Sequence, residues 1–319
     1  MTTYIIRRLI QALVVLIMVT LLIFFIMRLL PGDPLLIYLA QSAELEAMPP
    51  EMLDQLRHQF GLDRPLMVQY FTWIGGVLRG DFGTSIFYHH DVGALMAQRF
   101  PVTLHLGLLA LFFGATFGIL AGLAAAVRRG KWLDRIITPL TYIGITIPVF
   151  WLGILLIYLF GLKLHWLPIA GYTSPLENFW LSTRQVIMPV VCLAVFGLAA
   201  NARQMRSAML EVIRQDYVRT AWSKGLSERR IIIKHAMKNS LIPVITLMGI
   251  GVGIIFGGSV LVETVFAIPG VGRLLVSSIF AQDYVVVQAI TFVIAVIVLT
   301  VNLIVDISYG WFDPRIRYG

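Results

Sequence analysis

The sequence predicts an all-α, polytopic membrane protein with six transmembrane helices. Composition is the first reason, because hydrophobic residues make up 58% of the 319 positions and charged residues only 13%. Soluble domains carry about twice that share of charge, and the mean hydropathy here is +0.84. The second reason is that apolar stretches long enough to cross a bilayer recur along the chain. The third is that most basic residues lie at the ends of these stretches.

The apolar stretches each approach the ~20 residues that a membrane-spanning helix needs. The first is too long for the core of a signal peptide and lacks a small-residue cleavage site, so we interpret it as an uncleaved anchor. The fourth is the shortest, and we expect its helix to continue past Arg203 and Arg206, whose long side chains can reach toward the headgroups. The six predicted spans are 9–30, 102–127, 136–160, 186–200, 241–262 and 285–309.

Orientation follows from the positive-inside rule. With the N-terminus inside, the inner segments hold 17 of the 25 Lys and Arg residues. Both termini are therefore predicted to be cytoplasmic, and the spans are predicted to contact the lipid bilayer. The net charge of +8 does not indicate nucleic acid, because the basic residues flank the spans. The single cysteine, Cys192, lies in an apolar span and excludes an intramolecular disulfide.

The outer segment between the first two spans, residues 31–99, is long for a simple connection. Residues 49–61 predict a short helix, and Asp63-Arg-Pro65 opens a second whose Leu66, Tyr70, Trp73 and Val77 share one face. Two interpretations stay open for this extracytoplasmic helical insertion. It is a passive cap on the helix bundle, or it is a docking surface for an extracytoplasmic partner.

Between spans four and five, residues 216–230 are polar and basic and are expected inside. Gly225 can supply the left-handed turn that ends a first short helix. Ser227 can cap a second helix, with Glu228 in its first turn. A structured basic segment outside the bilayer indicates contact with something in the cytosol. The alternative is a solvated loop that its positive charge keeps inside.

These residues resemble the coupling segment of binding-protein-dependent ABC importer permeases, most closely the dipeptide/oligopeptide/nickel branch. Arg219 and Thr220 replace the Glu-Ala of the wider superfamily, whereas Ala221 and Gly225 match it. His-Ala-Met-Lys at 235–238 replaces Ile-x-Leu-Pro, as it does within the peptide branch. The resemblance rests on Tyr-Val-Arg-Thr-Ala at 217–221, Lys-Gly-Leu-Ser at 224–227 and Ile-Pro at 242–243, with ordered landmarks such as 30–34, 61–65, 80–83, 99–103, 150–153, 263–272, 283–284, Asn302, Asp306 and 313–317.

The resemblance implies a type I importer permease that pairs with a second homologous permease in the bacterial plasma (inner) membrane. It also implies cytosolic ABC ATPase subunits and an extracytoplasmic solute-binding protein. This chain itself needs no cofactor, since ATP and Mg would be bound by the ATPases. The implied substrate is a di- or oligopeptide, with nickel chelates or glutathione as alternatives. The residues expected to contact the ATPase are Ala221, Lys224, Gly225, Leu226, Ser227, Arg229 and Arg230.

The expected organisation has four parts. Residues 1–30 form the cytoplasmic N-terminus and first span, and 31–99 form the insertion. Residues 100–309 form a five-helix core that includes a cytoplasmic coupling segment at 208–240. Residues 310–319 form a cytoplasmic tail.

A stand-alone ion-coupled secondary transporter is the alternative of another class. Such a protein needs several intramembrane carboxylates, and only Asp306 and Glu263 qualify. We expect Asp306 to pair with a basic group at the interface. The sequence lacks Walker A, Gly-x-Ser-x-Gly and His-Glu-x-x-His motifs, so we predict a transport subunit and not an enzyme. The glycines at 249–258 predict close helix packing, and His89-His90 predicts a solvated loop.

Overall fold

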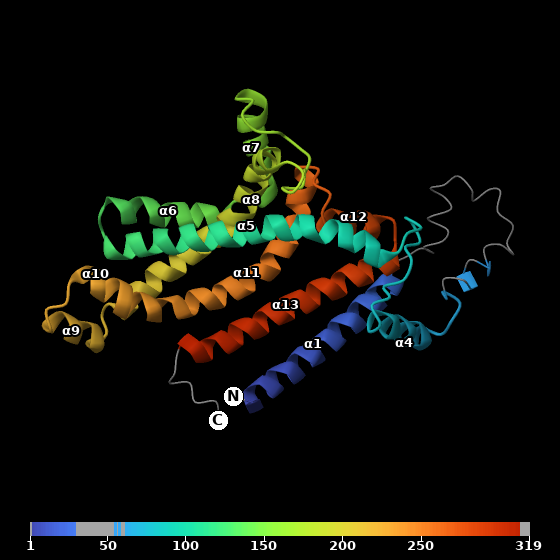
Figure 1. Cartoon of the computed structure of the whole chain (residues 1–319), viewed down its shortest axis with the longest axis horizontal. Helices are drawn as coiled ribbons and strands as arrows, with labels where there is room; N and C mark the ends of the chain where they lie inside the picture. Colours follow the sequence, from blue (N-terminus) through green and yellow to red (C-terminus); the bar gives the residue numbers. More distant parts are fainter. Residues whose placement is uncertain (1, 30–53, 56, 59–60, 313–319) are drawn as a thin grey trace. The chain divides into compact units, whose positions relative to one another are not determined.

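The computed structural model describes residues 2–29, 54–55, 57–58 and 61–312, and these residues are mostly helical (Figure 1). Five helices are long and apolar enough to cross a membrane, and a sixth span is formed if one bent helix pair is counted. The six-span, all-α prediction is therefore confirmed. The one β feature among the described residues is a bridge between Thr84 and Asp91.

The chain divides into two compact units. Unit 1 contains residues up to Arg8, then Val102–Ile268, then the chain from Val298. Its elements include most of α5 and the whole central part of the sequence. Their bounds are α5 Val92–Val127, α6 Trp132–Thr146, α7 Val149–Leu156, the π-helical η1 Ile157–Lys163, α8 Phe179–Val212, α9 Asp216–Ser223, α10 Glu228–Arg230, the π-helical η2 Ile231–Ala236 and α11 Met237–Val265.

The third predicted span is a broken one. Helices α6 and α7 meet at Ile147-Pro148 with a bend of 106°. Proline removes a backbone donor and disfavours the helical conformation of the residue before it, and Ile147 accordingly adopts an extended ψ of 126°. Pro139 and Pro189 have no such effect, because α6 and α8 continue through them. The prediction that the fourth span extends past Arg206 is confirmed by α8.

Small residues let α5 approach α8 closely. A Cβ added to Gly114 would lie 3.2 Å from the Ala194 carbonyl oxygen, and one added to Gly118 would lie 2.7 Å from the Leu198 oxygen. Gly122, which the sequence analysis did not single out, would clash with the Ala202 oxygen. The glycines of α11 differ from one another. A Cβ added to Gly249 would lie 2.8 Å from the Val305 side chain, whereas one added to Gly251 or Gly257 would have no atom within 4 Å. The prediction of close packing covered all the glycines at 249–258, but Gly251 and Gly257 are not closely packed.

Unit 2 contains Leu9–Pro101 and Pro269–Ile297. Val92, Met96, Val271, Val286 and Ile290 form its buried apolar core. The loop at 84–91 is fixed to this core by Asp283, whose carboxylate accepts from the Ser85 hydroxyl and the Phe87 amide. The elements that contribute to this unit are α1 Thr2–Leu29, α4 Leu66–Val77, the start of α5, α12 Val271–Phe280 and the first part of α13 Tyr284–Phe312.

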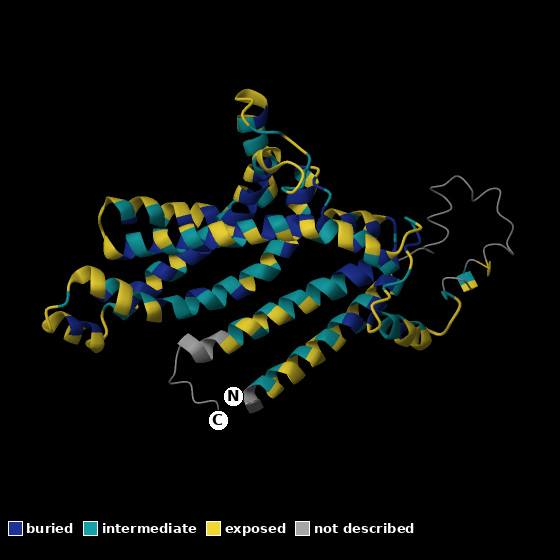
Figure 2. Ribbon diagram, viewed as in Figure 1, coloured by how far each residue is buried: buried dark blue, intermediate teal, exposed yellow. Residues whose placement is uncertain are grey.

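The predicted amphipathic helix after Pro65 is confirmed as α4, with Tyr70 and Val77 buried. Helix α5 begins at Val92, and the boundary predicted at residue 99 lies within this helix. The helix predicted at 49–61 and the tail predicted at 310–319 lie mostly outside the described residues, and residues 310–312 belong to α13. Figure 2 shows exposed residues repeating along α1; they include Leu13, Met18 and Leu22 and form an apolar surface suited to lipid.

Candidate functional site

The basic segment between α8 and α11 is a pair of short helices (Figure 1). Helix α9 ends at Ser223, and Gly225 follows with φ +75°. The Gly225 amide donates to the Trp222 carbonyl at 2.9 Å, and the Leu226 amide donates to the Ala221 carbonyl at 3.4 Å. This pairing is a Schellman closure, in which a left-handed glycine turns the chain out of the helix. The turn predicted at Gly225 is therefore present.

The two short helices share a small apolar core of their own. Val218, Ala221 and Ile231 are buried, and Val212 and Leu226 pack against them. Leu226 is the residue after the left-handed glycine, so its side chain provides the apolar contact that usually accompanies this closure. A solvated loop would lack such a core, which argues against that alternative for residues 216–230.

The residues predicted to contact an ATPase occupy two environments. Ala221 is 7% exposed and lies in the small core, so it supports the segment and presents little surface to a partner. Leu226 is partly buried in the same core. The other five lie on the exposed side of the turn and of the second helix: Lys224, Gly225, Ser227, Arg229 and Arg230.

Ser227 occupies the N-cap position of α10 in an extended conformation, but its side chain makes no capping hydrogen bond. Its carbonyl instead accepts from the Arg230 and Ile231 amides. The predicted position of the helix start is correct, and the predicted side-chain cap is wrong. Ser227 is exposed.

Trp222 is a surface feature that the sequence analysis missed. Its side chain is 50% exposed on α9, beside Lys224 at the turn. Exposed aromatic residues flanked by basic ones are frequent anchors at protein interfaces. The available signal was a tryptophan in a short segment that the sequence places outside the membrane. A second unforeseen contact joins Asn239 of α11 to the Tyr217 hydroxyl at 2.7 Å and fixes the start of α9.

A groove of about 540 Å³ lies next to the second short helix. Its walls come from the end of α5 and from residues that follow Ser227. Arg128 and Arg229 provide positive charge, and Glu228 is the acidic residue among the groove's lining. The floor is apolar and is made by Leu123, Val127, Leu133 and Ile232, among others.

A buried ion pair joins α6 to α8 within unit 1. Arg206 Nε donates to Asp134 Oδ1 at 2.6 Å, and Nη2 donates to Oδ2 at 2.9 Å. The Gly130 amide and the Thr138 hydroxyl also donate to this carboxylate, which is 6% exposed. The expectation that Arg206 reaches for headgroups is therefore wrong, because its guanidinium faces an acid on a neighbouring helix. The sequence analysis did not identify Asp134, whose available signal was a lone acid in a basic inner segment.

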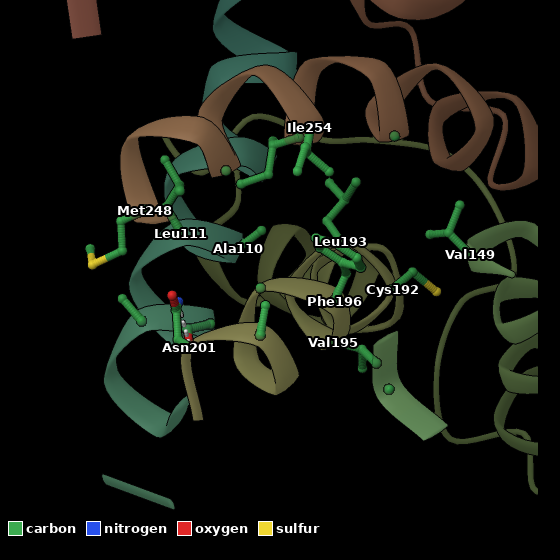
Figure 3. Close-up of a pocket in the computed structure, with 18 of the residues that line it drawn as sticks. Ala110, Leu111, Val149, Cys192, Leu193, Val195, Phe196, Asn201, Met248 and Ile254 are labelled. Carbon is green, nitrogen blue, oxygen red and sulfur yellow. Dashed lines mark hydrogen bonds between the residues drawn. The ribbon is translucent and has the colours of Figure 1, made fainter. Parts of the chain in front are cut away.

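Unit 1 also contains an apolar cavity of about 210 Å³ (Figure 3). Residues of α5, α8 and α11 line it, including Leu111, Cys192, Phe196 and Met248. Asn201 is the one amide side chain of its described lining, and its Nδ2 donates to the Gly114 carbonyl at 3.4 Å. Cys192 is buried there as predicted. Few polar groups are available to satisfy the charged ends of a peptide, so this cavity does not suit a zwitterionic solute.

The two intramembrane carboxylates are both engaged. Asp306 Oδ2 lies 3.2 Å from Arg8 Nη1. This ion pair confirms the expected pairing with a basic group. Glu263 is fully buried and accepts from the Thr103 hydroxyl at 2.6 Å. Within the described ranges, no group of three or more His, Cys, Asp or Glu side chains could hold a metal ion. Each of these two carboxylates thus has a partner within the described part of the chain.

Comparison with known families gives matches that together cover nearly the whole chain. Residues 118–318 match the family described as binding-protein-dependent transport system inner membrane component. Residues 1–107 match the corresponding N-terminal family of membrane components. The first match includes the whole basic segment and both residues of the buried ion pair, Asp134 and Arg206.

Curated relatives are similar over the full length. A putative peptide transport system permease protein of Brucella abortus is 41% identical, with 100% of both chains covered. The di/tripeptide transport system permease protein DppB of Pseudomonas aeruginosa is 40% identical over 94% of each chain. The glutathione transport system permease protein GsiC of Salmonella choleraesuis is 39% identical, again with 100% of both chains covered.

Solved structures support the fold. A chain of the MetNI methionine ABC transporter in an inward-facing conformation matches with a TM-score of 0.54 at 19% identity, covering 69% of this chain and 96% of that one. A second crystal form of that transporter gives a TM-score of 0.53. The predicted type I importer permease fold is confirmed. The chain therefore belongs to the family of inner membrane components of binding-protein-dependent transport systems, and it is a transport permease subunit and not an enzyme.

Proposed function

We propose that this permease imports di- and oligopeptides in an ATP-driven complex. The observation that carries the proposal is the packed two-helix segment at 216–236 in a chain that matches peptide permeases over its full length. Glutathione is the second candidate, because GsiC is 39% identical over the whole chain. Glutathione is itself a small peptide, so both candidates have charged termini and several amide groups.

The exposed side of the segment is the surface that we assign to a cytosolic ATPase subunit. Lys224, Arg229 and Arg230 provide charge, and Trp222 provides an apolar anchor. ATP and Mg would bind to the ATPase, and this chain would need no cofactor. The small core formed by Val218, Ala221 and Ile231 packs the two short helices together, so in this proposal a displacement of their outer face is passed to α8 and α11.

A second permease subunit completes the pathway in this proposal. The cavity within unit 1 has a volume of only about 210 Å³ and an apolar lining. It therefore offers little room and few hydrogen-bonding groups for a charged peptide. A pathway between two permease chains is the alternative that accommodates such a solute. The solute-binding protein would deliver the peptide from outside, and the segment at 31–99 is the surface that we assign to its docking. Both termini would then be cytoplasmic.

Uptake by the reconstituted complex tests the proposal. The complete transporter, with its second permease, ATPases and binding protein, is placed in liposomes and supplied with labelled dipeptide, oligopeptide, glutathione or nickel chelate. We expect ATP-dependent accumulation of a peptide that requires the binding protein. Accumulation of nickel alone, or uptake driven by an ion gradient without ATP, would contradict it.

A further inference from the structure

Unit 2 contains a cavity of about 170 Å³ that is lined by α1, α4, α13 and the turn before α4. This volume is far more than one water molecule needs. Its lining is rich in hydrogen-bond donors, namely Arg28, Arg64, Trp73 and Gln288. None of its described lining residues is an Asp or a Glu.

Arg28 is held in place by neutral groups. Its Nε and Nη2 donate to the Gln69 amide oxygen at 3.1 and 2.9 Å. Its guanidinium carbon lies 3.6 Å from the centre of the Phe24 ring. Gln69 in turn donates to the Leu62 and Arg64 carbonyls. Arg28 is thus fixed at the cavity, and no described carboxylate forms an ion pair with it.

Two further donors are buried without a partner. The Trp73 Nε1 and Gln288 Nε2 atoms are inaccessible to solvent and make no hydrogen bond within the described structure. Gln288 as a whole is only 3% exposed. Buried donors are nearly always satisfied, so two of them lining one cavity require an explanation. Both residues line the cavity, so an acceptor bound there would approach these two donors.

The chemistry of such an acceptor follows from the lining. A guanidinium and two N–H donors, with no described acid beside them, favour an anion that has several acceptor oxygens. A phosphate group meets this requirement. An ammonium group next to the phosphate would find no carboxylate among the described lining residues, so an anionic headgroup fits better than a zwitterionic one.

Exposed apolar side chains lie on two of the helices that line the cavity. Leu29 on α1 is 81% exposed, and Met67 and Phe71 on α4 are 60% and 68% exposed. Acyl chains suit such a surface at the end of a membrane-spanning helix, with the headgroup beside the polar residues. We propose that the cavity between Arg28, Trp73 and Gln288 binds the phosphate of an anionic phospholipid. The inference concerns lipid and is independent of the transported solute.

Phosphatidylglycerol is the probe for the test. The complete transporter is purified, delipidated in detergent and titrated with phosphatidylglycerol, with bound lipid counted by native mass spectrometry and stability followed by thermal melting. Inorganic phosphate and uncharged diacylglycerol form the comparison arms. We expect phosphatidylglycerol to bind and raise the melting temperature well beyond either comparison. Equal stabilisation by inorganic phosphate would overturn the lipid assignment, and no stabilisation by either would overturn the anion site.

Trp73→Phe isolates the N–H group, because the substitution keeps an aromatic ring in its place. If the indole N–H binds lipid, the variant loses about tenfold in affinity for phosphatidylglycerol. Its lipid-free melting temperature should stay the same or rise, since an unsatisfied buried donor has been removed. A merely structural tryptophan predicts the reverse, with a lower melting temperature and unchanged lipid affinity.

Arg64→Gln and Arg79→Gln form a matched pair for charge. Both residues are exposed arginines of unit 2, but only Arg64 lines the cavity. We expect Arg64→Gln to weaken phosphatidylglycerol binding severalfold and Arg79→Gln to leave it unchanged. Equal losses in the two variants would show diffuse attraction to the protein surface and contradict a specific site.

Discussion

Arg206 of α8 donates two hydrogen bonds to the carboxylate of Asp134 on α6, at 2.6 and 2.9 Å. The carboxylate is shielded from water, and the same helix α8 continues to Val212, four residues before the two-helix segment begins at Asp216. The pair therefore links the broken third span to the helix that supports the proposed ATPase contact. We infer that α6 and the end of α8 move together.

Replacing Arg206 with Met should destabilise the permease by about 3 kcal/mol, because it leaves the Asp134 carboxylate buried and unpaired. Breaking a buried ion pair usually costs about 3–5 kcal/mol. We take the low end because the Arg206 side chain is itself 28% exposed. The apparent melting temperature of the purified complex measures the effect. Arg203→Met is the matched control, since Arg203 is exposed and makes no described ion pair; equal losses in the two variants would contradict the role of the pair.

The double variant Asp134→Leu with Arg206→Met tests whether the charge pair or the helix contact matters. Removing both charges avoids an uncompensated buried ion, so stability should recover in large part. Recovery should be incomplete, because the Gly130 amide and Thr138 hydroxyl lose their acceptor. A double variant no more stable than Arg206→Met alone would contradict this account.

Gly225→Val should uncouple ATP hydrolysis from transport. The φ of +75° is unfavourable for a β-branched residue and costs about 1–2 kcal/mol there. A Cβ at this position meets nothing within 4 Å, so backbone strain is the sole local effect. We expect a complex that assembles and binds ATP but transports poorly. Gly225→Asn is the control, because asparagine tolerates the left-handed conformation and should retain most uptake.

Trp222→Ala should weaken the association of the ATPase subunit by about 2 kcal/mol, or about thirtyfold, if Trp222 is an interface anchor. The fold of the segment should persist, because this side chain is half exposed and outside the small core. Co-purification of the ATPase with the permease measures the change. Trp132→Ala is the matched variant, as Trp132 is 63% exposed at the start of α6, and it should leave the association intact.

Local rules predicted much of the structure. The glycine turn, the α4 stripe and the extension of α8 past Arg206 each depend on a few neighbouring residues, and each is present. The partner of Asp306 could be predicted only as a basic group, because hydropathy does not indicate which helix end lies nearby. Arg8 proves to be that partner.

Contacts between distant segments could not be predicted. Asp134 and Arg206 are 72 positions apart, and neither local sequence indicates that the two residues form a pair. The Pro148 bend was recognisable from proline chemistry, yet Pro139 and Pro189 look the same in sequence and leave their helices unbroken. The donor-rich cavity is equally hidden, because Arg28, Trp73 and Gln288 come from three separate helices.

Leu176→Cys and Ser227→Cys should report the orientation of the chain. With both termini inside, an impermeant thiol reagent added outside spheroplasts should label Leu176→Cys, which is 96% exposed in the native side chain. Ser227→Cys, also at an exposed position, should react only after the membrane is opened. The native Cys192 is buried and should stay silent.

Ser85 would be a poor reporter of the same outer side, although it lies in a polar stretch of sequence. Its side chain is fully buried and its hydroxyl donates to Asp283, so a cysteine there would react slowly from either side. The charge bias of the sequence predicts the pattern described for Leu176 and Ser227. Labelling in the opposite pattern would reverse the topology, and it would place the two-helix segment where no cytosolic ATPase could reach it.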